Sequence, residues 1–125
     1  MPPVRSIQVR VKEVRTNPAF ERAVEDAIVY ALEKTASEAV IQAKRRPRMP
    51  VRTGTLQSSI QHRGAHRLSK GRFGILWGSF DVRYALYQEM GFRTRSGKFY
   101  PGRRFLRGAA EETYPRFYDY LRSRL

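Results

Sequence analysis

The sequence predicts an α+β protein in which a long N-terminal helix packs on a small, mostly antiparallel, curved sheet and a C-terminal helix completes the chain. Apolar residues alternate with polar or small ones in two segments, which is typical of strands buried on one face. In two other segments they recur every three or four residues, which is typical of amphipathic helices. The chain has 125 residues, 41% hydrophobic and 12% aromatic, so we expect residues 1–125 to form a single domain.

The first strand is predicted over residues 5–12. Ile7, Val9 and Val11 alternate there with polar or basic side chains, so one face of the strand is apolar and the other is polar. We therefore expect this strand to cover part of the core with one face only.

A long helix is predicted from Pro18 to about Lys44. Asn17 is a favourable N-cap residue, and proline suits the first helical position. The helix would be roughly 40 Å long at 1.5 Å per residue, and it has to end before Pro47 and Pro50. Apolar and small residues on one face would allow it to pack closely on a sheet or another helix: Phe20, Val24, Ala27, Ile28, Ala31, Leu32, Thr35, Ala36, Ala39, Val40 and Ala43.

The second half of the chain predicts a hairpin, a basic loop and a closing helix. The hairpin is expected around residues 59–80, where Phe73, Ile75 and Trp77 alternate with glycine or leucine after a Ser-Lys-Gly turn. Residues 84–91 fit a strand or a helix equally well, and residues 93–104 predict a basic loop rich in glycine and proline. The closing helix has one apolar face: Leu106, Ala109, Ala110, Thr113, Phe117, Tyr120 and Leu121.

Positive charge is concentrated in two parts of the sequence. The chain has 25 Lys+Arg against 11 Asp+Glu, a net charge of +14, and no acid lies between Glu38 and Asp81 or between Glu89 and Glu111. A lone domain of this charge repels itself, so we expect a polyanion such as nucleic acid, or a large assembly, as its partner. The basic residues expected to face DNA or a neighbouring protein are Arg45, Arg46, Arg48, Arg52, Arg93, Arg95, Lys98, Arg103 and Arg104.

Enzymatic and metal chemistry find little support in the sequence. The chain has no cysteine, which excludes disulfides, thiolate nucleophiles and cysteine zinc sites. His62 and His66 are four residues apart, but no carboxylate lies within fourteen residues of either. Ser58, His62 and Asp81 lack any motif that would activate the serine. We expect no enzyme, no metal and no cofactor.

Two further classes of site are also disfavoured. Gly91 and Gly97-Lys98 differ from a phosphate-binding loop in glycine spacing, and Phe99 stands where that loop has Ser or Thr. No apolar run approaches the ~18 residues of a membrane span, and the N-terminal residues lack the apolar region of a secretory signal. We expect no membrane partner and a protein that is soluble in the cytoplasm when made.

Aromatic residues interleave with the second basic region and leave two interpretations open. They could stack on the bases of a single-stranded nucleic acid, or they could belong to the core, which we expect of Phe105 because it begins an apolar helix face. No helix-turn-helix, zinc finger or RNA-binding signature accompanies them. The aromatic residues concerned are Phe92, Phe99, Tyr100 and Phe105.

Three segments resemble motifs of the tail-completion, or head-tail joining, family of long-tailed bacteriophages. Residues 50–60 (PVRTGTLQSSI) are similar to its signature P-V-x-T-G-x-L-x-x-S-I, and residues 84–92 (YALYQEMGF) to its segment Y-A-x-Y-x-E-x-G-T. Residues 105–109 (FLRGA) resemble its closing P-F-L-R-P-A. The order of the predicted elements also matches the family: a long N-terminal helix, the Thr-Gly turn, the hairpin, the Tyr-Ala segment, the basic loop and the final helix. With these elements the resemblance covers nearly the whole chain. The departures are Arg52 for a common aspartate, Phe92 for a threonine, and Arg104 and Gly108 near common prolines.

The resemblance implies a structural virion protein of a tailed phage or phage-like particle, located in the virion neck and in the host cytoplasm during assembly. Such proteins form a ring, commonly of six subunits, that joins the head connector to the tail and surrounds the DNA channel. The partners would be further copies of the chain, neighbouring neck, connector and tail proteins, and phage DNA through non-specific contact. The matched residues would be structural: Pro50, Thr53, Gly54, Leu56, Ile60, Tyr84, Ala85, Tyr87, Glu89, Gly91 and Phe105.

Particular roles are expected for some of these residues. Gly54 and Gly91 should adopt backbone conformations that a side chain would hinder, and Thr53 should hydrogen-bond its turn. Leu56, Ile60, Tyr84 and Tyr87 should anchor the turns to the core, and Glu89 should form a salt bridge with an arginine of the same or a neighbouring subunit. The alternative function is a stand-alone, non-specific nucleic-acid-binding protein, and a small hydrolase is a remote third.

Overall fold

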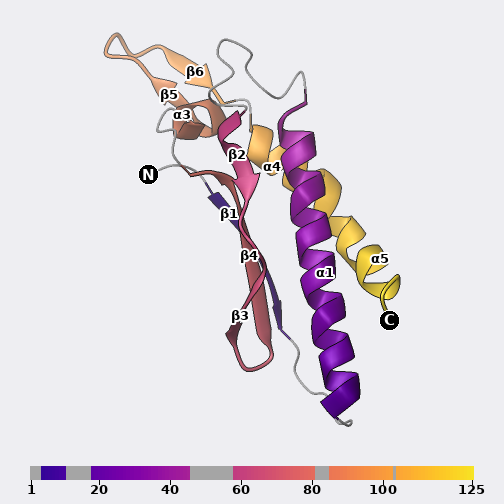
Figure 1. The fold of residues 1–125 in the computed structure, drawn as a ribbon. Helices are drawn as coiled ribbons and strands as arrows, with labels where there is room; N and C mark the ends of the chain where they lie inside the picture. Colours follow the sequence, from indigo (N-terminus) through magenta and orange to yellow (C-terminus); the bar gives the residue numbers. More distant parts are fainter. Residues whose placement is uncertain (1–3, 11–17, 46–57, 81–84, 103) are drawn as a thin grey trace.

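The computed structural model describes residues 4–10, 18–45, 58–80, 85–102 and 104–125, and it has the α+β architecture that the sequence predicts (Figure 1). Its elements in chain order are β1 (Val4–Arg10), α1 (Pro18–Ala43), β2 (Ile60–His62), β3 (His66–Ser69), β4 (Arg72–Ser79), α3 (Ala85–Met90), β5 (Gly91–Arg93), β6 (Phe99–Pro101), α4 (Phe105–Thr113), the 3-10 turn η1 (Tyr114–Arg116) and α5 (Phe117–Arg122).

Strand β4 is the centre of the main sheet. β1 pairs with one side of it, while β2 and β3 pair with the other side, and all of these pairings are antiparallel. Because directly paired residues in an antiparallel sheet share a face, the register Ile7↔Ile75 and Val9↔Phe73 places apolar side chains together on one face. The hairpin predicted around residues 59–80 is confirmed as β3 and β4, with Trp77 fully buried.

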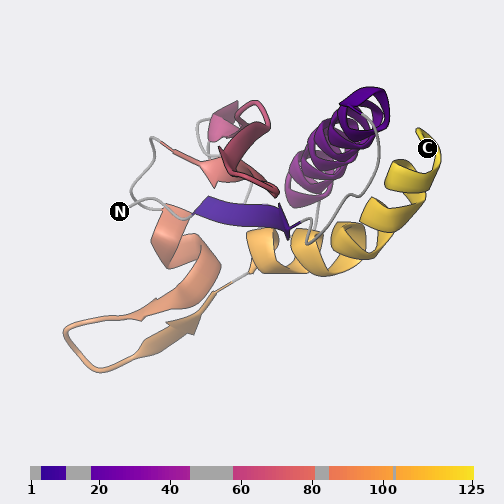
Figure 2. The same ribbon diagram turned by 90° about the horizontal axis from the view of Figure 1, so that it is seen from below.

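Helix α1 lies against the apolar face of this sheet. The predicted helix from Pro18 to about Lys44 is confirmed, because α1 runs from Pro18 to Ala43. Its small residues allow the close packing expected from the sequence, with contacts to β4 on one side and to α4 and α5 on another. Figure 2 shows α1 and the C-terminal helices on the same side of the sheet. The alanines at these contacts are Ala27, Ala31, Ala36, Ala39 and Ala43, each at most 2% exposed.

The C-terminal helix is divided where the sequence predicts one continuous helix. α4 ends at Thr113, η1 follows, and α5 begins at Phe117. Pro115 lies in η1, and its missing N–H and its ring disfavour a continuous α-helix at this point. The predicted apolar face is nevertheless on the core, because Phe105, Leu106, Ala109, Ala110, Thr113 and Phe117 are all buried.

Polar contacts connect the layers of the core. The Trp77 indole Nε1 donates a hydrogen bond to the Tyr114 hydroxyl at 2.9 Å, which joins β4 to η1. His62 Nε2 lies 3.1 Å from the Ser37 Oγ, which joins β2 to α1. Each of these contacts gives a side chain between layers a hydrogen-bond partner, as buried polar groups require.

The segment from residue 84 onward differs most from expectation. Of the two structures that its periodicity allowed, residues 85–90 form the short helix α3. The loop expected over residues 93–104 is wrong, because β5 and β6 pair there as an antiparallel hairpin with the register Phe92↔Tyr100. Each strand has only three residues, which is too short for alternation to be visible among the basic and turn-forming residues.

Candidate functional site: a projecting aromatic and basic arm

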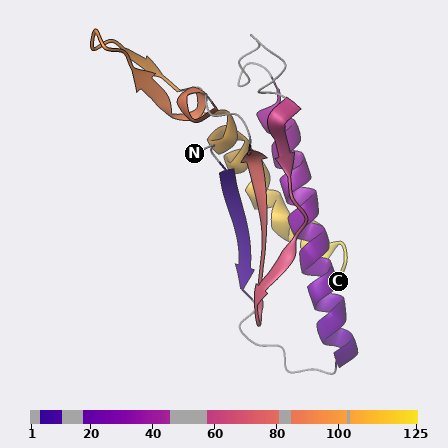
Figure 3. The ribbon, with the colours of Figure 1, turned by 60° about the vertical axis from the view of Figure 1, so that its left-hand side comes forward.

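Residues 85–102 form a separate arm on the molecule, made of α3, β5 and β6. Figures 1 and 3 show the β5–β6 hairpin extending beyond the end of the sheet, away from the body formed by β1–β4, α1, α4, η1 and α5. The β5–β6 pair is a two-stranded sheet of its own and is not part of the main sheet. The β5–β6 hairpin of the arm therefore projects from the body, whereas α3 at its base contacts α4 and buries Ala85.

The arm exposes large apolar side chains. Tyr87, Met90 and Phe99 are more than half exposed, at 54%, 53% and 53%. Several exposed apolar side chains on one projecting segment are typical of a surface that contacts another molecule, whereas single exposed residues are common. The exposed large hydrophobic residues of the arm are Leu86, Tyr87, Met90, Phe92, Phe99 and Tyr100.

Three of the aromatic rings form one cluster. Phe92 and Tyr100 stack, with ring centroids 5.2 Å apart and an interplanar angle of 19°. Tyr87 meets Phe92 edge to face, with centroids 6.1 Å apart. Because Phe92 and Tyr100 are cross-strand partners, this stack stabilises the hairpin and at the same time presents its outer surface to solvent.

Positive charge lies beside two of the aromatic rings of the arm. The Lys98 ammonium lies 4.9 Å from the centre of the Tyr100 ring, and the Arg93 guanidinium lies 5.7 Å from that of Phe99. Arg93 also donates a hydrogen bond to the Gly97 carbonyl at 3.0 Å, which holds the turn. With Arg95 exposed near the tip and no acid between residues 90 and 110, the arm is both apolar and basic.

Glu89 attaches the arm to the body. Its carboxylate accepts hydrogen bonds from the backbone N–H groups of Leu106 at 2.8 Å and Arg107 at 3.1 Å, in the first turn of α4. Glu89 is 5% exposed, and a carboxylate at the positive end of a helix is favourable. Within the described residues, backbone amides of α4 bind the Glu89 carboxylate, and the salt bridge with an arginine of the same or a neighbouring subunit stays a prediction.

Arg104 explains why α4 needs this external cap. It occupies the N-cap position with φ 50° and ψ 42°, and its own side chain makes no capping hydrogen bond. Its backbone N–H donates to the Glu89 carbonyl at 3.2 Å, so the Glu89 residue binds the start of α4 through both main chain and side chain. A proline at position 104 would be incompatible with this φ and would remove this donor.

Two glycines allow two stretches of backbone to pack closely against each other at the base of the arm. Gly91 has φ 87°, and a Cβ on it would lie 2.5 Å from the Tyr100 carbonyl oxygen. A Cβ on Gly102 would collide with the Glu89 carbonyl oxygen. The expectation that Gly91 adopts a conformation hindered by a side chain is confirmed, whereas the sequence gives no sign of the equal need for glycine at 102.

The other predicted motif residues divide into three groups. Ile60, Ala85 and Phe105 are buried, at 1%, 0% and 0% exposure, so the core roles of Ile60 and Phe105 are confirmed. The core role predicted for Tyr87 is wrong, because its ring lies on the exposed face of α3 and contacts Phe92. Outside the described residues lie Arg46, Arg48, Pro50, Arg52, Thr53, Gly54, Leu56, Tyr84 and Arg103, and also Val11, Lys12, Asn17 and Asp81 from the other predictions.

Those residues of the predicted basic set that the structure describes lie toward one end of the molecule. Arg93, Arg95 and Lys98 are on the arm and Arg104 is at its base, while Arg45 follows α1. In Figure 1 the C-terminal end of α1 lies at the same end of the molecule as the arm. All five residues are exposed, so an acidic surface or a phosphate backbone can reach them.

The described part of the chain contains no group of three or more His, Cys, Asp or Glu residues placed to hold a metal ion. His62 and His66 lie on the separate strands β2 and β3, and His62 contacts Ser37. Within the same ranges, none of the helices has the length and apolar character needed to cross a bilayer.

Comparison of the chain with protein-family models, curated proteins and solved structures finds no match. The resemblance to the tail-completion family therefore rests on the motifs in residues 50–60, 84–92 and 105–109.

Proposed function

We propose that this protein is a structural virion protein of a tailed phage or phage-like particle, which assembles as a ring in the neck, joins the head connector to the tail and surrounds the DNA channel. Six subunits is the stoichiometry that the family resemblance favours. The ordered motifs in residues 50–60, 84–92 and 105–109 support this function, as does the α+β fold with its long N-terminal helix.

The exposed arm is the observation that carries the proposal. Its aromatic cluster is uncovered, yet its base is held to α4 by the Glu89 carboxylate and by the close approach of Gly91 and Gly102. A rigidly mounted apolar projection is unfavourable in water for a monomer and becomes favourable when a partner covers it. An assembly protein needs such a surface, and a catalyst does not.

The net charge of +14 fits the same function. In a neck ring, arginine and lysine side chains would face the phosphate backbone of the DNA in the channel or the acidic surfaces of neighbouring neck proteins. The protein would act without a cofactor and without catalysis, first in the host cytoplasm and then in the virion.

The proposal is tested by the size of the purified protein in low salt, measured by light scattering after gel filtration, alone and with the portal and tail proteins of its own genome. We expect a ring-sized oligomer or a stable complex with a neighbour, and a ring in electron micrographs of the particle neck. A strict monomer that binds neither neighbour would overturn the proposal.

A second candidate is non-specific binding of nucleic acid by the isolated chain. It is favoured by the arginine and lysine side chains next to exposed aromatic rings on the arm. It predicts a DNA mobility shift whose affinity falls by orders of magnitude between about 50 and 200 mM salt, because several phosphate counterions are released. If the isolated protein does not shift DNA at low salt, this candidate fails while the first is unaffected.

A further inference from the structure

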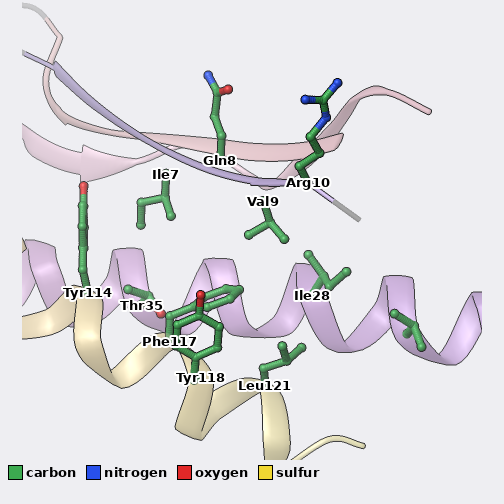
Figure 4. Close-up of a pocket in the computed structure, with 11 residues that line it drawn as sticks. Ile7, Gln8, Val9, Arg10, Ile28, Thr35, Tyr114, Phe117, Tyr118 and Leu121 are labelled. Atoms are coloured by element: carbon green, nitrogen blue, oxygen red, sulfur yellow. The ribbon is translucent and has the colours of Figure 1, made fainter. Parts of the chain in front are cut away.

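A groove runs along the body beside the edge strand β1. It has a volume of about 520 Å³ and lies between β1 on one side and α1, η1 and α5 on the other (Figure 4). Apolar side chains form most of its wall: Ile7, Val9, Val24, Ile28, Phe117 and Leu121. A volume of this size, lined in this way, is in the range of sites that bind a ligand or a side-chain cluster.

The groove opens along a free edge of the sheet. β1 pairs only with β4, so its other edge has no strand partner among the described elements. Gln8 and Arg10 line the groove together with Ile7 and Val9, although Figure 4 shows the two pairs pointing to opposite sides of the strand. The backbone of β1 therefore forms part of the rim, along the side of the strand that has no strand partner among the described elements.

The arm of the same chain is not placed to fill this groove. In Figures 1 and 3 the arm projects from one end of the body, next to the C-terminal end of α1. On α1 the groove is lined by Val24, Ile28 and Thr35, so it extends from the middle of α1 toward its N-terminal end, which lies at the other end of the body. An apolar projection at one end of a chain and an apolar groove toward the other are the two halves of a head-to-tail contact between copies.

Charge favours the same pairing. Helix α1 has five acids and two bases, a net charge of −3, and is the most acidic of the described elements. Residues 91–101 of the arm have three bases and no acid, a net charge of +3. Glu21 and Glu25 lie on the face of α1 that also carries Val24 and Ile28, and this places them at the rim of the groove. Among the described residues that line the groove, Arg10 is the one basic residue.

We propose that the arm of one copy of this chain, residues 85–102, seats in the groove between β1 and α1/α5 of the next copy. This inference rests on the ring assembly proposed above and names the two surfaces that form its subunit contact. The aromatic cluster around Phe92 enters the apolar groove, while Arg95 and Lys98 meet Glu21 and Glu25 at its rim. The contact uses different surfaces on the two subunits, so it generates a ring when the rotation closes.

The absence of cysteine makes a cross-linking test direct. Ser96→Cys at the tip of the arm is combined with Val24→Cys, which lines the groove on α1 between Glu21 and Glu25, in separate chains that are mixed at low salt and oxidised mildly. We expect a disulfide-linked dimer from this mixture. Ser96→Cys mixed with Ser69→Cys is the matched control, because Ser69 is exposed on β3, at the opposite edge of the sheet from β1.

Charge exchange is the second test and does not depend on a cross-link. Arg95→Glu with Lys98→Glu should raise the concentration needed for assembly by about tenfold or more, because four like charges then meet at the rim. Adding Glu21→Lys and Glu25→Lys to the same chain should restore assembly. All four residues are exposed or half-buried, and circular dichroism and urea unfolding of each variant should match the parent protein.

The outcomes separate this contact from the ring itself. Assembly of the parent protein with no cross-link above the Ser69→Cys control, and no rescue by charge exchange, would overturn the arm-in-groove contact and leave the neck function intact. A small apolar ligand retained in native mass spectra, without the cross-link, would also overturn it. A chain that fails to assemble under any of these conditions overturns both proposals.

Discussion

The body and the arm of this protein use the same kinds of residue in opposite ways. In the body, apolar side chains from α1, β4, α4 and α5 are buried together, and Trp77, Leu32 and Phe105 are fully enclosed. In the arm, Phe92 and Phe99 are exposed, and the basic side chain of Arg93 lies beside the Phe99 ring. Apolar content alone therefore does not define the core, since the decisive feature is whether another layer of the same chain covers the side chain.

The largest expected effect is in the body. Trp77→Ala should lower the free energy of unfolding by about 3–5 kcal/mol, because it opens a cavity between β4 and the helices and removes the hydrogen bond to Tyr114. Urea unfolding measures this loss. Tyr114→Phe removes the hydrogen-bond partner alone and should cost about 1 kcal/mol, so a similar loss from both variants would contradict the cavity as the main cause.

The next effect is at the junction of the two regions. Gly91→Ala should cost about 2–4 kcal/mol, because the residue has φ 87° and its Cβ would meet the backbone of residues 100–102. Hydrogen exchange should show that protection is lost in β5 and β6 and kept in α1. Gly64→Ala is the control, since no atom lies within 4 Å of its Cβ position, and it should leave stability unchanged. Equal effects of the two variants would show that the arm base is less constrained than its geometry indicates.

Removing the attachment of the arm should have a smaller effect. Glu89→Gln replaces one acceptor oxygen with an NH₂ group that faces a backbone N–H of α4, and it should cost about 1–3 kcal/mol. The loss should be accompanied by faster exchange at the Leu106 and Arg107 amides. Glu111→Gln affects only an exposed ion pair with Arg107 and should change stability by less than about 0.5 kcal/mol. A loss no larger than that of Glu111→Gln would refute the capping role.

The smallest effect on stability should come from the arm surface. Phe99→Ser changes a side chain that is 53% exposed, so its cost should be no more than about 0.5 kcal/mol. Assembly measured by light scattering should nevertheless be impaired, because the uncovered ring belongs to the contact surface. Unchanged assembly would show that the exposed Phe99 ring is not needed for oligomer formation. A large loss of stability would show that the arm belongs to the core.

Much of the body could be predicted from local patterns. The alternation at Ile7 and Val9 and the long helical repeat after Pro18 correspond to β1 and α1, because each pattern reflects burial of one face over several residues. The break at η1 interrupts the predicted closing helix, although Pro115 is a visible signal for it. The arm is a hairpin where a loop is predicted, because three-residue strands are too short to show a period.

The candidate site depends on contacts that no local pattern contains. Glu89 caps a helix that begins sixteen residues later, and Gly102 is needed because the backbone of Glu89 and Gly91 lies against it. Basic residues follow Glu89 closely in the sequence, which favours an arginine partner. In the folded structure, backbone amides of α4 bind its carboxylate. Tyr87 is expected in the core for a similar reason, since its motif does not show on which side of α3 the body lies.

Local sequence patterns were sufficient for the class of fold, the positions of the long helix, the first strand and the main hairpin, and the basic regions, while the motif resemblance indicated the need for glycine at 91. These features follow from side-chain period, backbone freedom and charge, which are properties of neighbouring residues. The folded structure was needed to show that residues 91–101 project as a hairpin, that Glu89 binds the start of α4, and that a groove opens beside β1. Those features depend on which distant surfaces of the folded chain meet and which remain uncovered, and a one-dimensional pattern does not contain that information.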